Sequence, residues 1–248
     1  MNALVIIAAG GMGTRMKLKE GESKQYLKLG RYPVLHHTLK AFEVCAFVSS
    51  MAVATQPDYL YDLVRLVNRA SFKKVHHFLQ GGKERQDSIF NCIEVFASIY
   101  RAMSEEKKRE TVILIHDGAR PLIQPQDIER IASDALHFGA AVPATKPKDT
   151  IKFIDESGEF FGETLERNRL RQVQTPQGFR AQLIIDAHLK AKADGFYATD
   201  DAALVERYFP EQKIKIVETG YHNLKLTTPE DLEIAKAILK HLSKTQSP

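Results

Sequence analysis

The sequence predicts an α/β fold with a doubly wound, mostly parallel sheet and a projecting β-hairpin arm, and three observations support this prediction. Short apolar runs alternate with amphipathic helical stretches along most of the 248 residues. One run, Thr111–Ile115, is apolar almost throughout, as a strand buried on both faces requires. Between residues 148 and 174 the helical period disappears, so this segment departs from the alternation.

The first half of the chain supplies the alternation. Leu4–Ala9 is an apolar run of strand length, and Pro33–Val44 carries apolar side chains at helical spacing. Four further segments continue as strand, helix, strand and helix in turn: Met51–Thr55, Pro57–Asn68, Lys74–Leu79 and Glu84–Ile99. After a charge-rich connection over Arg101–Glu110, Thr111–Ile115 should lie at the centre of the sheet. This order is typical of a Rossmann-like domain.

The segment 148–174 is predicted to form the arm. The run I-K-F-I-D-E-S-G-E-F-F-G indicates two short extended pieces around a turn at Ser157-Gly158. A hairpin of this length does not stabilise itself in water, so three phenylalanines should pack on another surface, namely Phe153, Phe160 and Phe161. A second copy of the chain is the most economical partner, and the chain's own domain is the alternative. We expect a single domain over residues 1–248 and a homodimer.

Composition narrows the class of protein. A hydrophobic content of 44% is enough for a sizeable core, and a dispersed net charge of +4 does not indicate a nucleic-acid surface, whereas a small anionic substrate accounts for it. Cys45 and Cys92 are isolated, which argues against a disulfide scaffold or a zinc cluster and favours the reducing cytoplasm. Leu4–Ala9 is too short to span a membrane and follows no basic leader. We therefore expect no nucleic-acid or membrane partner.

A glycine-rich turn follows the first predicted strand. Gly10, Gly11 and Gly13 allow a tight turn and leave amide N–H groups open to an anion, for which a phosphate is the natural choice. A plain strand-to-helix turn has the same composition, so the glycines alone are a weak signal. A dinucleotide-binding fingerprint would place a third glycine at Met16 and an acidic residue near Thr55, and the chain has neither.

The motifs along the chain resemble a known family. A-A-G-G-M-G-T-R at 8–15 followed by K-Q-Y-L at 24–27 is similar to the opening of nucleotidyltransferases that activate sugar or polyol phosphates. Six further motifs resemble the 2-C-methyl-D-erythritol 4-phosphate cytidylyltransferase family: G-G-K-E-R-Q-D-S at 81–88, H-D-G-A-R-P at 116–121, D-T-I-K at 149–152, Q-T-P-Q-G-F at 174–179, T-D-D-A-A-L-V-E at 199–206 and N-L-K-L-T-T-P-E-D-L at 223–232. The chain departs from the family pattern at Ser23, where proline is usual, and at Gly118, where alanine is usual.

The resemblance implies Mg²⁺-dependent transfer of a cytidylyl group from CTP to 2-C-methyl-D-erythritol 4-phosphate, with release of pyrophosphate, in non-mevalonate isoprenoid synthesis. A relative that uses ribitol 5-phosphate shares the first motif and is the alternative within this class of enzyme. A non-catalytic nucleotide-binding module is the alternative outside it. Such a module would be expected to lose Arg15, Lys24 or Asp117, and all three are present.

The chemistry of this transfer requires positive charge more than a general base. A phosphate ester that attacks a nucleoside triphosphate is already anionic at neutral pH, so the site must neutralise the repulsion between two polyanions. Arg15, in Gly13-Thr14-Arg15 where a P-loop would have Gly-Lys-Ser/Thr, and Lys24 fit that role. Asp117 follows the best predicted strand and suits Mg²⁺. An aspartate at this position could instead cap a turn, but the neighbouring Arg120 favours the site.

Further contacts follow from the resemblance. The nucleotide site comprises two glycine turns and their flanking residues: Ala8, Ala9, Gly10, Gly11, Gly13, Gly81 and Gly82. Ser88 reads the cytosine edge, although outside its motif it would be taken for an ordinary serine on a helix surface. Five residues are expected at the polyol phosphate: Arg120, Thr150, Arg167, Thr175 and Lys225. Arg167 could otherwise be a solvated charge, whereas Lys225 alternates with Leu224 and Leu226 and so faces away from the core side of a short strand.

The arm also has a consequence for the site. If the arm embraces a second subunit, as the resemblance implies, Lys24 and Asp117 come from one chain while Thr150 and Arg167 come from its partner.

The histidines carry less information about the site. The pairs His36-His37 and His76-His77 point in different directions as sequence neighbours, so neither predicts a chelate, and His116 is expected to be a packed residue at a strand end.

Overall fold

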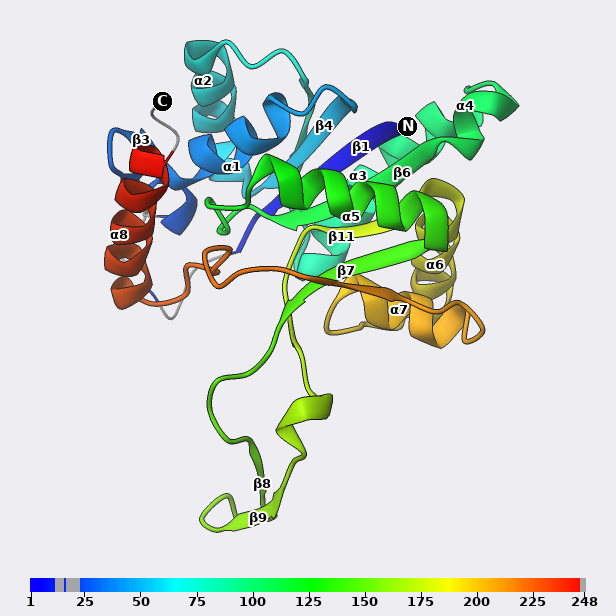
Figure 1. The fold of residues 1–248 in the computed structure, drawn as a ribbon. Coiled ribbons are helices and arrows are strands. Elements are labelled where there is room, and N and C mark those ends of the chain that lie inside the picture. Colours follow the sequence, from blue (N-terminus) through cyan, green and yellow to red (C-terminus); the bar gives the residue numbers. More distant parts are fainter. Residues whose placement is uncertain (12–15, 17–22, 246–248) are drawn as a thin grey trace.

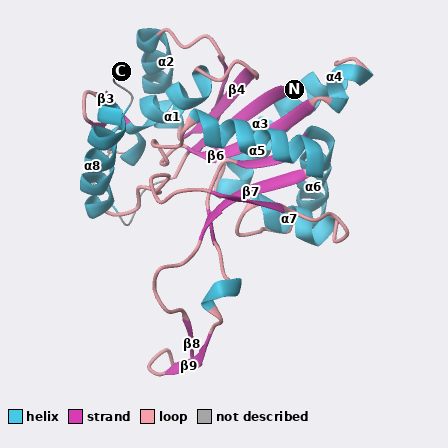
Figure 2. Ribbon diagram, viewed as in Figure 1, coloured by secondary structure: helices cyan, strands magenta, loops and turns pink. Residues whose placement is uncertain are grey.

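A computed structural model, which describes residues 1–11, 16 and 23–245, contains an eight-stranded, mostly parallel sheet (Figures 1 and 2). Seven strands follow the order β10-β7-β11-β6-β1-β4-β5, and β12 pairs with β7. Their bounds are β1 Asn2–Ala9, β4 Val48–Thr55, β5 Val75–Gln80, β6 Thr111–Asp117, β7 Ala140–Thr145, β10 Gln172–Val173, β11 Gln177–Arg180 and β12 Lys215–Glu218. Every residue of β6 is buried and β6 lies in the middle of this order, as the sequence predicts.

Helices cover both faces of the sheet (Figure 1). On one face α1, α2 and α5 form a core with Ala3, Val5 and Ile7, and on the other α3, α6 and α7 form a core with Leu4 and Ile6. The alternation follows from the two-residue side-chain period of β1. The bounds of these helices are α1 Val34–Glu43, α2 Leu60–Ala70, α3 Arg85–Arg101, α5 Pro125–Phe138, α6 Ala181–Asp194 and α7 Asp201–Tyr208. The fold is therefore doubly wound.

A third apolar cluster lies beside the carboxyl end of β6. It joins Leu29, Ala119 and Leu226 to Ala235 of the last helix, α8 (Pro229–Thr245). Short elements lead into this region: η2 (Lys24–Tyr26), β2 (Lys28–Leu29) and β3 (Tyr32–Pro33). Because Leu226 is fully buried here, the segment around it is anchored next to the sheet end.

Two sequence predictions need correction. The helix expected over Pro57–Asn68 begins as a 3-10 helix, η3 (Pro57–Tyr59), and continues as α2. The charge-rich connection over Arg101–Glu110 contains a short helix, α4 (Glu105–Arg109). The side chain of Ser104 accepts a hydrogen bond from the Lys107 amide at 3.3 Å, and two glutamates occupy the first turn, so capping and the helix dipole stabilise a helix that has no buried residue.

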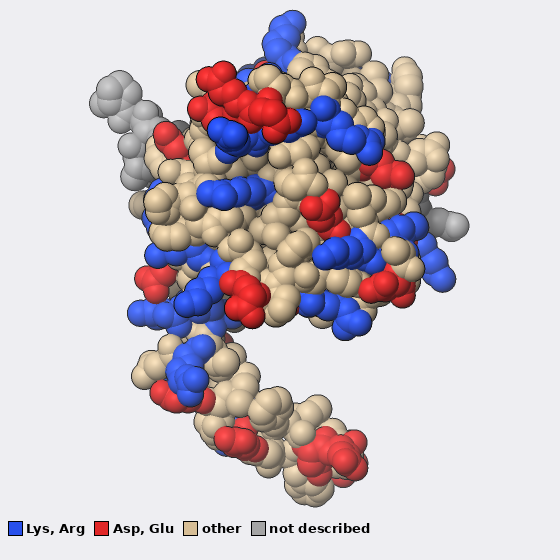
Figure 3. All heavy atoms as spheres, turned by 90° about the vertical axis from the view of Figure 1, so that its right-hand side faces the viewer, with Lys and Arg blue, Asp and Glu red and all other residues tan. Residues whose placement is uncertain are grey.

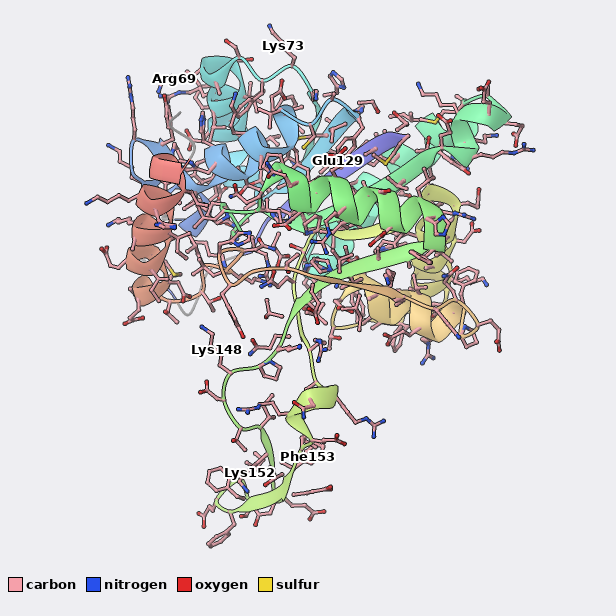
Figure 4. The ribbon with its side chains drawn as sticks, in the orientation of Figure 1. Arg69, Lys73, Glu129, Lys148, Lys152 and Phe153 are labelled. Atoms are coloured by element: carbon pink, nitrogen blue, oxygen red, sulfur yellow. The ribbon has the colours of Figure 1, made fainter. Side chains whose placement is uncertain are left out.

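The arm leaves β7 and returns through β10 (Figure 1). It carries the predicted hairpin, β8 (Lys152–Ile154) paired with β9 (Phe161–Thr164), followed by the 3-10 helix η4 (Arg167–Arg169). Phe153, which Figure 4 places well along the arm, is 56% exposed, and Phe160 and Phe161 are more exposed still. These rings do not pack on their own domain. Among the described residues, no helix has the length and apolarity needed to cross a membrane.

Candidate active site

A cavity of about 310 Å³ opens at the carboxyl ends of β1, β5 and β6. Its described walls come from five places: the end of β1 with the turn that follows, η2, the start of α3 with the turn before it, the end of β6, and the segment before α8. The lining residues are Ala8, Gly10, Gly11, Lys24, Gln25, Gly82, Lys83, Glu84, Arg85, Ser88, Asp117, Ala119, Lys225 and Thr227. Ligands of open α/β sheets bind at this edge. Of the predicted residues, Arg15 and Gly13 lie outside the described part of the chain.

Asp117 is the centre of the charge arrangement. Its Oδ1 lies 3.1 Å from Nε of Arg85, and its Oδ2 lies 3.0 Å from Nζ of Lys225 and 3.5 Å from Nε of Arg120. Burial alone raises the pKa of Asp117, but the charges of these three cations outweigh burial and hold the pKa well below its usual range. The carboxylate therefore stays ionised at physiological pH and cannot serve as a general base.

A buried chain of hydrogen bonds fixes the backbone of Asp117. Its amide donates to Oγ1 of Thr175 at 3.0 Å, and the Thr175 hydroxyl lies 3.0 Å from Nδ1 of His116. Nε2 of His116 lies 3.0 Å from the carbonyl oxygen of Arg120, which can only accept, so we assign the proton to Nε2 and the Thr175 hydroxyl as donor to Nδ1. Burial lowers the pKa of His116 to about 4. This neutral ring is a packed structural residue, as the sequence predicts, and the Thr175 hydroxyl holds the backbone of Asp117 in place.

Lys24 and Lys225 reach the cavity from opposite ends of the chain. Lys24 is only 8% exposed, and its Nζ donates to the carbonyl oxygen of Leu226 at 3.2 Å. Lys225 lies in the segment before α8, which is not the short strand that the sequence predicts. The facing is nevertheless as predicted, because Leu224 and Leu226 join the apolar cluster while Lys225 contacts Asp117.

Arg120 supports the site from beneath the cavity wall. Its side chain is 11% exposed, and besides Asp117 its Nη1 donates to the carbonyl oxygen of Asn223 at 2.8 Å. Burial lowers the pKa of Arg120. Asn223 is itself fully buried and donates to the carbonyl oxygen of Thr175 at 2.8 Å. Arg120 thus ties the segment that carries Lys225 to the end of β6, and its predicted contact with the polyol phosphate stays a prediction.

The predicted nucleotide side of the cavity is built from two turns. Ser88 is 4% exposed in the first turns of α3, so it is not a surface serine. Its Oγ accepts from the Gly82 amide at 3.0 Å and donates to the carbonyl oxygen of Glu84 at 3.2 Å. An added Cβ at Gly82 would lie 2.2 Å from Cβ of Asp87, so only glycine fits that close approach.

The remaining nucleotide residues divide between the cavity wall and the layer behind it. Ala8, Gly10 and Gly11 line the cavity. Ala9 is buried and does not line it, and the Gly81 amide donates to the carbonyl oxygen of Thr55 at 2.6 Å, which fixes the second turn against β4. The two turns thus present their backbone to the same cavity.

Thr150 and Arg167 lie on the arm and do not line the cavity of their own chain. Both are exposed, and Nη1 of Arg167 donates to the carbonyl oxygen of Lys148 at 2.8 Å. Figure 4 places Lys148 on the part of the arm nearer the sheet. A single chain therefore does not bring these two predicted residues to Asp117.

Arg85 is a site residue that the sequence prediction missed. Its guanidinium bridges two buried carboxylates, Asp117 and, at 2.9 Å from Nη1, Asp201. Burial lowers the pKa of Arg85, but the two carboxylates outweigh burial and raise it. Arg85 opens α3, where the helix dipole disfavours a cation. That unfavourable position, inside a motif already singled out, was the available signal.

The donor set bears on a metal ion. The described residues contain no group of three or more His, Cys, Asp and Glu side chains able to hold one. Mg²⁺ in phosphate-transfer sites commonly takes one or two carboxylates and completes its shell with substrate phosphates and water. Asp117 fits that pattern as a single carboxylate on the cavity wall. The residues therefore suit a metal that arrives with a triphosphate.

Comparisons with known proteins agree with this geometry. A family model described as 2-C-methyl-D-erythritol 4-phosphate cytidylyltransferase matches residues 3–241. A protein of that name from Chloroherpeton thalassium is 58% identical over 247 residues, which cover 99% of this chain and 100% of the relative. One from Pelodictyon phaeoclathratiforme is 53% identical over 247 residues, 98% of this chain and 99% of the relative.

Solved structures give the same result. The crystal structure of 4-diphosphocytidyl-2C-methyl-D-erythritol synthase from Anaerococcus prevotii has a TM-score of 0.78 and 27% identity, with 96% of each chain covered. That of 2-C-methyl-D-erythritol 4-phosphate cytidylyltransferase from Thermus thermophilus has a TM-score of 0.69 and 29% identity, covering 95% of this chain and 98% of the other. With the matching family model and the full-length relatives, these results establish that the chain belongs to the 2-C-methyl-D-erythritol 4-phosphate cytidylyltransferase family.

Proposed function

We propose that this chain transfers the CMP group of CTP to 2-C-methyl-D-erythritol 4-phosphate, giving 4-diphosphocytidyl-2-C-methyl-D-erythritol and pyrophosphate in the non-mevalonate isoprenoid pathway. The observation that carries the proposal is a cavity of about 310 Å³ at the sheet edge, whose wall carries Lys24 beside the Asp117 carboxylate and its partners Arg85 and Lys225. A phosphate oxygen of the polyol attacks the α-phosphorus, and the bond from that phosphorus to the bridging oxygen of pyrophosphate breaks. Family membership supports the identity of both substrates.

The residues present suit a reaction that needs charge neutralisation. Asp117 is held ionised by its cations, and His116 is buried and neutral, so neither takes a proton from the nucleophile. A phosphate monoester requires no such step because it is already anionic. Lys24 and Lys225 would instead stabilise the negative charge that accumulates on the α-phosphoryl oxygens in the transition state, together with Arg15.

We propose Mg²⁺ as the cofactor, with Asp117 as its protein ligand. The ion would neutralise triphosphate charge and orient the pyrophosphate leaving group. Before a metal ion can share Oδ2 of Asp117, Nζ of Lys225 must move away from that oxygen, since the two lie 3.0 Å apart. The side chain of Lys225 is 37% exposed, so it is free to turn towards an incoming phosphate.

Selection of cytosine is proposed to depend on Ser88. The hydroxyl proton points to the carbonyl oxygen of Glu84, which can only accept, while the Gly82 amide occupies one lone pair. The capacity left on Oγ is one acceptor lone pair. The amino group of cytosine is a donor, whereas the corresponding uracil oxygen is an acceptor, so this hydroxyl favours CTP over UTP.

We propose that the working molecule is a cytoplasmic homodimer in which each arm completes the partner's site. Two observations support this arrangement: the exposed apolar rings on the arm, and the absence of Thr150 and Arg167 from the lining of their own chain's cavity. Figure 3 shows acidic and uncharged side chains towards the far end of the arm and basic ones near its junction with the body. Cys45 and Cys92 are free and buried, which suits a reducing compartment.

The experiment incubates the protein with each of the four ribonucleoside triphosphates, paired with 2-C-methyl-D-erythritol 4-phosphate or ribitol 5-phosphate, and measures pyrophosphate. We expect release only with CTP and 2-C-methyl-D-erythritol 4-phosphate. Omission of Mg²⁺ should abolish it. If no pair released pyrophosphate, the proposal that the protein is an enzyme would be refuted. If only ribitol 5-phosphate gave pyrophosphate, ribitol 5-phosphate would be the substrate.

A further inference from the structure

The T-D-D motif at 199–201 places two neighbouring aspartates in different surroundings. Asp200 caps α7, since its side chain accepts from the Ala203 amide at 2.9 Å and from Nε2 of Gln177 at 2.8 Å. Asp201 is 1% exposed and belongs to no cap. The first aspartate therefore has a structural role that the second does not share.

Asp201 contacts the site through Arg85. One carboxylate oxygen lies 2.9 Å from Nη1 of Arg85, and the other accepts from Nε2 of His188 at 3.1 Å. Burial raises the pKa of Asp201, but Arg85 and His188 lower the pKa by more than burial raises it, so the carboxylate is ionised. The guanidinium of Arg85 also contacts Asp117, through its Nε. Charges of alternating sign thus run from Asp201 to the end of β6.

The first turn of α3 is fixed to the segment that precedes Asp201. The side chain of Gln86 makes two of these contacts: its Nε2 donates to the carbonyl oxygen of Phe196 at 2.8 Å, and its Oε1 accepts from the Ala198 backbone amide at 2.9 Å. The Tyr197 hydroxyl donates to Asp87 at 2.9 Å. The backbone on both sides of the Arg85–Asp201 ion pair is therefore held together by contacts that do not involve the pair itself.

We propose that Asp201 is a positioning residue for cytidylyl transfer: it holds the Arg85 guanidinium against Asp117 and prevents Arg85 from turning onto the triphosphate. A guanidinium is planar, so fixing Nη1 at Asp201 also fixes Nε at Asp117. A triphosphate in the cavity competes for Arg85, whose side chain is 30% exposed. The buried charge of Asp201 opposes that competition. Lys225 has no such second carboxylate in the described part of the chain and is the cation that moves.

The proposal rests on the proposed function, and a double-mutant cycle tests it. Asp201→Asn should lower kcat by about 10- to 100-fold, because Asp117 and Arg85 lose their alignment, while the KM for CTP changes by less than about threefold. In the Arg85→Gln background the same substitution should have almost no further effect on kcat, since Asp201 then has no guanidinium to hold. Equal losses in both backgrounds would overturn the proposal.

The matched control is Asp200→Asn, which keeps an oxygen for the α7 cap but removes the carboxylate oxygen that accepts from Nε2 of Gln177, and it changes no contact of Arg85. It should lower the melting temperature and leave kcat of the folded protein near the parental value. If Arg85→Gln fails to fold, Arg85→Lys serves, because lysine keeps the charge but has one nitrogen and cannot bridge two carboxylates.

An NMR measurement separates this proposal from the proposed function. The Nε–H signal of Arg85, assigned by its absence in Arg85→Lys, should exchange slowly with solvent in the parental and Asp200→Asn proteins and rapidly in Asp201→Asn. If the parental protein releases no pyrophosphate but this pattern appears, the function fails and the positioning of Arg85 stands. Slow exchange in Asp201→Asn would refute the positioning whatever the activity.

Discussion

Lys24 is held in place before any substrate binds. Its burial and its hydrogen bond to the carbonyl oxygen of Leu226 set the ammonium at the cavity wall, in contrast to the more exposed Lys225. A charge that is already positioned needs no reorganisation when negative charge develops in the transition state. Lys24 is thus suited to act on turnover.

Lys24→Ala should therefore lower kcat by about 10²- to 10³-fold and change the KM for the polyol phosphate far less. Steady-state kinetics at varied polyol phosphate and saturating CTP measures both constants. Near-parental turnover at saturating substrates would show that Lys24 is only a loop residue.

Ser88 gives a second prediction. Ser88→Ala should reduce the ratio of kcat/KM for CTP to that for UTP by about tenfold, because the acceptor for the cytosine amino group is lost. Ser98→Ala is a matched control, since Ser98 lies exposed on the same helix and its Oγ donates to the Glu94 carbonyl oxygen in the same way. An unchanged ratio in Ser88→Ala would contradict the assignment.

The histidine beneath the site predicts a pH dependence of stability. Burial lowers the pKa of His116 from its ordinary value of 6.5 to about 4, so the unfolded state binds its proton first as the pH falls. Stability from this residue is complete above about pH 6.5 and is lost progressively as the pH falls towards 4, with a slope of up to about 1.4 kcal/mol per pH unit for one proton. Denaturant unfolding at several pH values measures how the free energy of unfolding changes with pH. The change per pH unit should be smaller in His116→Gln than in the parental protein. An equal change in both would exclude His116 as the source of this pH dependence.

At the scale of elements, the glycine turn before α3 gives a further prediction. An alanine at Gly82 places its Cβ 2.2 Å from Asp87, and the turn must move away from the helix start. Gly82→Ala should lower the free energy of unfolding by about 1–3 kcal/mol and weaken CTP binding. At Gly162 an added Cβ meets Phe153 at an ordinary 3.6 Å, so Gly162→Ala is the steric control. Equal stability of both variants would refute the close-approach argument.

The elements also show what sequence alone could predict. Buried strands and helices follow from apolar periodicity, and the rule that ligands bind at carboxyl strand ends placed Asp117 correctly. Lys225 alternates with leucines like a strand residue, yet the segment is fixed by the Leu226 amide donating to Ala119 and by Arg120 at Asn223. Periodicity cannot separate such tertiary anchoring from strand pairing.

The site prediction had a similar limit. Ser88 and the glycine turns lie in local motifs, so sequence could mark them. The role of Arg85 depends on Asp201, which is far along the chain and comes close only through the packing of α3 against α6 and α7. Arg15 and Gly13 remain predictions because they lie outside the described residues.

At the scale of the whole molecule, the arm predicts that two chains share each site. Asp117→Asn and Arg167→Ala should each be inactive alone. When the two are unfolded together and co-refolded, half of the dimers are mixed, and one of the two sites in each mixed dimer has both residues intact, so activity should return to roughly a quarter of the parental value. Sedimentation should show a dimer, and recovery of no activity would discard the shared site while leaving the transferase function untouched.

The position of β11 has a consequence for how the chain is made. β11 lies between β6 and β7 in the sheet but follows both in sequence. A ribosome therefore releases β6, β7 and the whole arm before the strand that joins the two halves of the sheet. Until Gln177–Arg180 emerges, β6 is an open strand edge able to pair with another nascent chain. Once the few residues that follow the arm have emerged, β11 pairs with β6 and covers that edge. The strand is then no longer open to another nascent chain.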